Sequence, residues 1–110
     1  MGRTEKVNFD FFRLETSFFS NKKIKSLRRL HGAIGVSTYL YLLCYIYGND
    51  GYYMQFSSIE QLSYDIAEAV ANGNVAHVAG RITDSINYLA KNGMLDEDYI
   101  AKGVITSVSI

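Results

Sequence analysis

The feature that most constrains this chain is the apolar run at residues 37–47, which a Gly-Asn-Asp-Gly turn ends at residues 48–51. Together with the short stretch that follows it, up to residue 56, the run contains six of the nine tyrosines. Such a segment is typical of a membrane span, an aromatic binding platform or the central helix of a small domain. A membrane-spanning helix needs about 20 consecutive apolar residues, and this run is well short of that. Because the run is apolar on every face, the sequence predicts a core helix over residues 33–47 and no membrane association.

Length and cysteine content set the broad class of the protein. At 110 residues the chain is long enough for one domain with a core, and we expect a single domain over residues 1–110. The only cysteine, Cys44, lies inside the apolar run, which predicts a small buried thiol in a reducing compartment. Residues 1–12 carry charge but no continuous apolar stretch, so we expect no signal peptide and a cytoplasmic protein.

Charge is distributed unevenly along the chain. Residues 1–30 carry eight basic and three acidic side chains, a balance of +5, whereas residues 31–110 carry three basic and eight acidic ones, a balance of −5. If the protein meets a polyanion, the first third is where electrostatics favours the contact.

The first half of the chain predicts an N-terminal arm at residues 1–20, pinned to the core by its phenylalanines, followed by two helices within residues 22–47. Ser20 or Asn21 is suited to cap the first helix, and Gly32 to end it. Its apolar stripe and its basic stripe lie on opposite faces; they consist of Ile24, Leu27 and Leu30, and of Lys22, Lys25 and Arg29.

The second half predicts a strand at residues 52–56, a helix-turn-helix at residues 58–92, and wing strands within residues 93–110. Ser57 or Ser58 is suited to cap the helix at residues 59–70, and Gly73 and Asn74 to form the turn before the helix at residues 75–92. The strands "MLD" (94–96) and "VITSVSI" (104–110) flank a polar link at residues 97–103. This order predicts a mainly helical α+β fold, a winged helix-turn-helix with an added N-terminal helix and a small antiparallel sheet; the alternative is an unspecified α+β domain.

The segment "FFSNKKIKSLRRLHGAIGVSTYLYLLCYIYGNDGYY" (18–53), with "NGMLD" (92–96) and "GVITS" (103–107), resembles the N-terminal domain of a family of phage and prophage proteins of bacteria. Members are often labelled replisome organiser or replication initiation protein, and often labelled uncharacterised. The shared pattern is an aromatic pair, a basic helix that begins K-I, a G-x-x-G at Gly32 and Gly35, Y-L-x-L-L, I-Y and G-Y-Y. The resemblance implies a winged-helix DNA-binding domain at the N-terminal end of a longer replication protein.

No combination of residues in the sequence predicts catalysis. His31 and His77 lack cysteine or acidic neighbours at metal-ligand spacing, and no nucleotide-binding glycine pattern is present. The acidic cluster Asp96, Glu97 and Asp98 is typical of a solvated loop. We therefore expect a protein that is not an enzyme and that needs no cofactor and no metal.

Binding of double-stranded DNA is the function that the sequence favours. The second helix of a helix-turn-helix usually enters the major groove, and the basic stripe of the first helix would add phosphate contacts. The candidate DNA-binding residues are Lys22, Lys25, Arg29, Asn74, His77, Arg81, Tyr88 and Lys91. Asp84 lies at the centre of the same helix face and would repel phosphate.

The alternative is a protein-interaction or self-assembly module with little intrinsic affinity for DNA, whose partners would be replication proteins or further copies of the chain. Exposed tyrosines would serve such a module, because tyrosine supplies contact area at low entropic cost. Tyr52, Tyr53 and Tyr88 are the candidates, although half-buried packing is the commoner fate of the first two.

Overall fold

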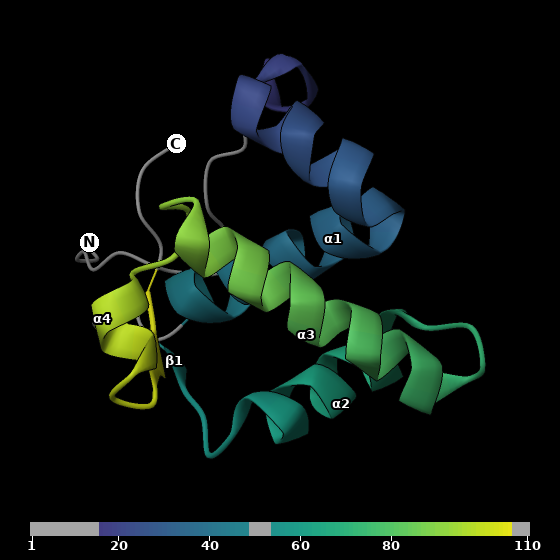
Figure 1. Cartoon of the computed structure of the whole chain (residues 1–110), viewed down its shortest axis with the longest axis vertical. Helices are drawn as coiled ribbons and strands as arrows, with labels where there is room; N and C mark the ends of the chain where they lie inside the picture. The colour runs from purple at the N-terminus through teal and green to yellow at the C-terminus, as the bar shows by residue number, and fades with distance from the viewer. Residues whose placement is uncertain (1–15, 49–53, 107–110) are drawn as a thin grey trace, which may run out of the picture.

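The computed structural model describes residues 16–48 and 54–106, which form a small, mainly helical α+β fold (Figure 1). Its elements are, in chain order, the 3-10 turn η1 (Phe18–Ser20), α1 (Lys22–Gly48), β1 (Met54–Gln55), α2 (Ile59–Val70), α3 (Val75–Lys91), α4 (Glu97–Ile100) and β2 (Val104–Ile105). Helix α3 packs against both α1 and α2, and the strands lie with α4 at one side. The predicted helices at residues 59–70 and 75–92 are confirmed to within one residue.

Helix α1 consists of two helical halves that meet at a kink. The Asn21 side chain accepts a hydrogen bond of 2.8 Å from the backbone N–H of Lys23, which confirms Asn21 as the cap of the first half. Gly32, with φ 68° and ψ −162°, interrupts the helical backbone. This combination of angles is essentially restricted to glycine, so the residue that was predicted to end the first helix turns the chain into the second.

The second glycine of the "GAIG" motif allows the two halves of α1 to approach each other. A Cβ at Gly35 would lie 2.6 Å from Cβ of His31 and 3.1 Å from Cδ1 of Leu27, both in the preceding half. Real Cβ atoms essentially never come as close as the first distance, so Gly35 must lack a side chain where the halves meet. The two glycines therefore have different tasks, one in the backbone turn and one in the close packing.

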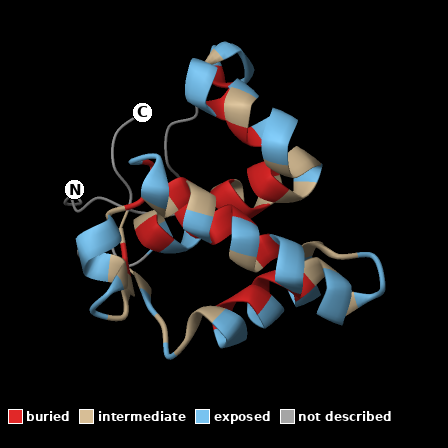
Figure 2. Ribbon diagram, in the orientation of Figure 1, coloured by how far each residue is buried: buried red, intermediate tan, exposed pale blue. Residues whose placement is uncertain are grey.

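The core lies between α1, α2 and α3, where Figure 2 shows the buried faces of these helices turned toward one another. Its fully buried large side chains are Tyr39, Ile24, Leu27, Leu42, Ile46, Ile66, Ile82, Ile86, Leu89, Met94, Leu95 and Ile105. The prediction that the second half of α1 is the central helix is confirmed for the face that carries Tyr39, Leu42 and Ile46. Phe18 of the N-terminal arm is also buried, whereas Phe19 is exposed.

Two burial predictions are wrong. Leu30 is 63% exposed. It lies two residues before the kink at Gly32, where α1 changes direction, and no neighbouring helix covers it. Cys44 is exposed rather than buried, because α2 and α3 cover only one side of the second half of α1. An all-round apolar sequence thus does not require an all-round buried helix here.

Helix α2 is capped, and joined to α3, much as the sequence predicts, whereas α3 has no side-chain cap. Oγ of Ser58 accepts a 3.0 Å hydrogen bond from the backbone N–H of Gln61. Gly73 has φ 91° and Asn74 has φ 52°, so both turn residues are left-handed, and Asn74 stands at the N-cap position of α3 without a side-chain cap bond. Between the helices, the hydroxyl groups of Ser63 and Thr83 are hydrogen-bonded at 2.7 Å.

The sheet is smaller than predicted. Met54 pairs with Ile105 and Gln55 with Val104 in an antiparallel register, and the backbone N–H of Phe56 donates to the carbonyl of Gly103 at 3.1 Å. Among the described residues, 94–96 form no extended strand, with only an isolated bridge at Leu95. Tyr52, Tyr53 and residues 107–110 of the predicted strands lie outside the described residues.

The predicted polar link at residues 97–103 contains the short helix α4. Oδ1 of Asp96 accepts hydrogen bonds from the backbone N–H groups of Asp98 and Tyr99, at 3.0 and 3.3 Å. The acidic cluster therefore starts a helical turn and not a loop, while Glu97 and Asp98 are exposed to solvent as predicted.

Within the described part of the chain, α1 is the one helix long and apolar enough, by length and composition, to cross a membrane. The core helix of a globular protein can meet the same criteria of length and apolar composition. Here the first half of α1 carries five basic side chains, and the backbone is kinked at Gly32. The second half contributes seven buried residues, Gly35, Val36, Thr38, Tyr39, Leu42, Leu43 and Ile46. These features favour a core helix of a small globular protein.

Candidate nucleic-acid interface

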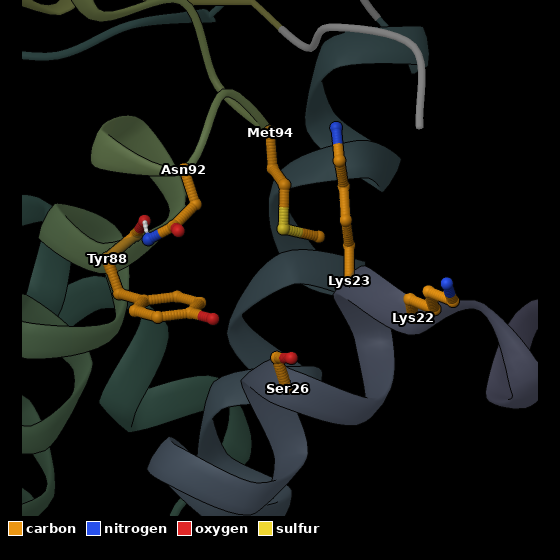
Figure 3. Close-up of a pocket in the computed structure, with 6 residues that line it drawn as sticks. All are labelled: Lys22, Lys23, Ser26, Tyr88, Asn92 and Met94. Atoms are coloured by element: carbon orange, nitrogen blue, oxygen red, sulfur yellow. Dashed lines mark hydrogen bonds between the residues drawn. The ribbon is translucent and has the colours of Figure 1, made fainter.

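A pocket of about 190 Å³ lies where the first half of α1 meets the C-terminal end of α3. It is lined by Lys22, Lys23 and Ser26 from α1 and by Tyr88, Asn92 and Met94 from the end of α3 and the turn that follows it. Figure 3 shows the two sets on opposite sides of the opening. The pocket brings ammonium, hydroxyl and amide groups together, the donors that bind phosphate oxygens.

Contacts between α1 and α3 hold this arrangement in place. The rings of His31 and Tyr88 pack at a centroid distance of 4.9 Å. Nδ2 of Asn92 donates a 2.9 Å hydrogen bond to the carbonyl of Tyr88, which orients the amide at the rim of the pocket. Farther along α3, Nη2 of Arg81 would lie 3.6 Å from a Cβ at Gly32, so the Arg81 side chain reaches the kink of α1.

The electrostatics of this region is one-sided. Helix α1 contains five basic and no acidic side chains, all five within residues 22–29, and each of them is exposed. We call residues 22–29 the basic half of α1. A positive surface of this kind attracts the phosphate backbone of nucleic acids.

The structure brings together only some of the residues that the sequence predicts for DNA binding. Lys22 and Tyr88 line the pocket, and Lys25, Arg29, Arg81 and Lys91 are exposed. Asn74 and His77 are also exposed, but they lie at the opposite end of α3, which at ~1.5 Å per residue places His77 about 17 Å along the helix axis from Tyr88. The expectation that Tyr88 projects freely from α3 is wrong, because the ring is half-buried against His31.

Sequence reasoning missed Lys23, Ser26, Asn92 and Met94 as members of this site. Lys23 and Ser26 border the basic stripe, so a wider arc of the helix would have included them. Nothing in the sequence around Asn92 predicts a binding role, because this residue follows α3 and reaches the site only through the packing of α3 on α1.

Within residues 16–48 and 54–106, no group of three or more His, Cys, Asp or Glu side chains is arranged to hold a metal ion.

A family model described as "Lin1244/Lin1753-like, N-terminal" matches residues 11–110 of the chain. No curated protein and no solved structure matches the chain.

Proposed function

The chain belongs to the Lin1244/Lin1753-like N-terminal family, and we propose that it is a non-catalytic domain that binds double-stranded DNA. The observation that carries this proposal is the position of the basic half of α1 beside the C-terminal end of α3, with the donor-lined pocket between them. Five cations on one short helical segment, in a helix that contains no acidic residue, are suited to a phosphate backbone.

The order of the elements supports a winged-helix relationship. Helices α2 and α3, joined by the turn at residues 71–74, stand where a helix-turn-helix would, and β2 returns to pair with β1. In this comparison α4 occupies the place of the wing. The first turns of α3, with His77 and Arg81 exposed, would face base edges, while the basic half of α1 would hold phosphates.

The protein setting that the sequence favours is a phage-type replication initiation protein, or replisome organiser, acting in the bacterial cytoplasm. Basic residues 22–29 and the "GAIG" kink, which carry much of the sequence resemblance, also build the proposed interface. Asp84 opposes phosphate on the exposed face of α3, so we expect modest affinity that depends on the basic half of α1.

The test is a titration of a labelled duplex at two salt concentrations, followed by fluorescence anisotropy. We expect the affinity to fall steeply with salt, and to fall about tenfold or more in a Lys25→Glu, Arg29→Glu variant, because charge reversal removes phosphate contacts and adds repulsion. The matched control compares Arg29→Glu with Lys102→Glu, an equal charge change on an exposed residue beside α4. Absence of duplex binding at low salt, or an equal loss in both single variants, would contradict the proposal.

A second candidate function, a protein-interaction module, is favoured by the exposed rings of Tyr45, Tyr64 and Tyr99. The sequence predicted other tyrosines, Tyr52, Tyr53 and Tyr88, for such an interaction surface.

A further inference from the structure

The solvent-facing side of α2 presents an exposed aromatic ring among carboxylates. Tyr64 is 44% exposed. Glu60 and Glu68 lie one helical turn before and after it, Asp65 adjoins it, and all three acidic residues are exposed. Helix α2 contains no basic residue. Nε2 of Gln61 donates a 3.0 Å hydrogen bond to Oδ1 of Asp65, which fixes one of these carboxylates on the helix surface.

A second pair of rings extends this surface onto the neighbouring part of α1. Tyr41 and Tyr45 stack at a centroid distance of 4.7 Å, and Tyr45 is 47% exposed. Burial raises the pKa of the Tyr41 hydroxyl above its ordinary value, with smaller contributions from a hydrogen bond to Tyr45 and from the negative charges of Tyr45 and Asp65. Helices α1 and α2 contact each other, which places these rings on an element that packs against α2. We call Tyr45, Glu60, Tyr64, Asp65 and Glu68 the acidic tyrosine face.

The chain itself carries the complement of this face. The basic half of α1 has five cations and no anion, and the acidic tyrosine face has three anions and no cation. Figure 1 shows the first half of α1 at one end of the molecule and α2 at the other, so the two surfaces do not meet within one molecule. We propose that the acidic tyrosine face binds the basic half of α1 in a second copy of the chain.

The side chains of the two surfaces are complementary in chemical type as well as in charge. A guanidinium group binds the face of an exposed tyrosine ring and also forms paired hydrogen bonds with a carboxylate. Arg28 and Arg29 are exposed on the basic half, and Tyr64 offers a ring with Glu60 and Glu68 on either side. Tyrosine and arginine are the residues in which interface energy most often concentrates.

Because the two surfaces differ, the contact is heterologous, and each copy keeps one free surface of each kind for the next. Copies therefore assemble head to tail into short open chains whose length depends on concentration and salt. This inference does not depend on the proposed DNA function. If both hold, duplex DNA competes for the basic half and shortens the chains.

The test uses two variants that each lose one surface. In the first, Tyr64→Ala with Glu68→Gln removes the ring and one charge from the acidic tyrosine face. In the second, Lys25→Gln with Arg29→Gln removes two cations from the basic half. By sedimentation velocity at low salt we expect the wild type to form oligomers, each variant alone to be monomeric, and an equimolar mixture to form a 1:1 dimer and nothing longer, since only one intact pair of surfaces remains.

The matched control is Tyr99→Ala with Glu97→Gln, which removes an exposed ring and a neighbouring carboxylate from α4. It should assemble like the wild type. A monomeric wild type at low salt and high concentration, a mixture that stays monomeric, or equal losses in the control would each overturn the proposal. Duplex binding distinguishes it from the DNA function: if DNA binding is correct, the Tyr64→Ala, Glu68→Gln variant should bind duplex at least as tightly as the wild type, because its basic half is intact and no second copy competes for it.

Discussion

The two halves of α1 share one continuous segment of sequence but have opposite environments. The half before Gly32 carries every charged residue of the helix and buries only Ile24 and Leu27; the half after it carries no charge and buries seven residues. Glycine at the kink separates a surface suited to binding from a segment that supports the core. A positively charged surface is thus attached to a core helix by a change of backbone direction at a single residue.

The largest expected difference between the halves comes from one substitution made in each. Leu42→Ala empties a fully buried site and should lower the free energy of unfolding by about 2–5 kcal/mol. Leu30→Ala removes a side chain that is 63% exposed and should change it by less than about 0.5 kcal/mol. Urea unfolding followed by circular dichroism measures both. Similar losses would show that the first half of α1 packs as tightly as the second.

The joint between the halves is the next place to test. Gly32→Ala places a side chain where φ is 68°, and Gly35→Ala places a Cβ 2.6 Å from that of His31, so each should lower the free energy of unfolding by about 1–3 kcal/mol. Gly80→Ala is the matched control, because Gly80 lies in α3 with no atom within 4 Å of an added Cβ. That variant should be stabilised by about 0.5–1 kcal/mol. Thermal unfolding distinguishes the expected loss of stability at Gly32 and Gly35 from the expected gain at Gly80. A Gly32→Ala variant more stable than the wild type would contradict the kinked backbone at this residue.

Sequence reasoning recovered what depends on local physics. Apolar residues spaced three or four positions apart located α2 and α3. Asn21, Ser58 and Gly73 marked caps and turns, because their side chains, or the lack of one, act within a few residues. It failed where packing between distant segments decides. Leu30 belongs to the apolar stripe of its helix and Cys44 to an apolar run, but no helix covers either of them, and Asn92 joins the pocket only because α3 lies beside α1. Helix α4 was missed because the acidic residues were considered as charges rather than as a cap.

The buried half of α1 should also give the stability of the protein a signature at high pH. Burial raises the pKa of the Tyr39 hydroxyl to about 12 from its ordinary value of 10.0, with a further contribution from Tyr47. Because the folded state holds this proton more tightly than the unfolded state, the contribution is complete below pH 10 and is lost as pH rises toward 12. Tyr39→Phe cannot ionise there, so its free energy of unfolding should fall less steeply between these pH values. Parallel pH profiles for the two proteins would contradict the assignment.

The smallest expected effect concerns Cys44, which the sequence places among apolar residues and the structure places at the surface of the second half of α1. Cys44→Ser should change the free energy of unfolding by less than about 0.5 kcal/mol, because an exposed thiol loses little packing on replacement by a hydroxyl. The native thiol should also react with an aromatic disulfide reagent about as fast as it does in denaturant, after allowance for the effect of denaturant on a free cysteine. Slow native reaction together with a loss of about 1 kcal/mol or more would place Cys44 in the core after all, and would extend the buried surface of this half around the whole helix.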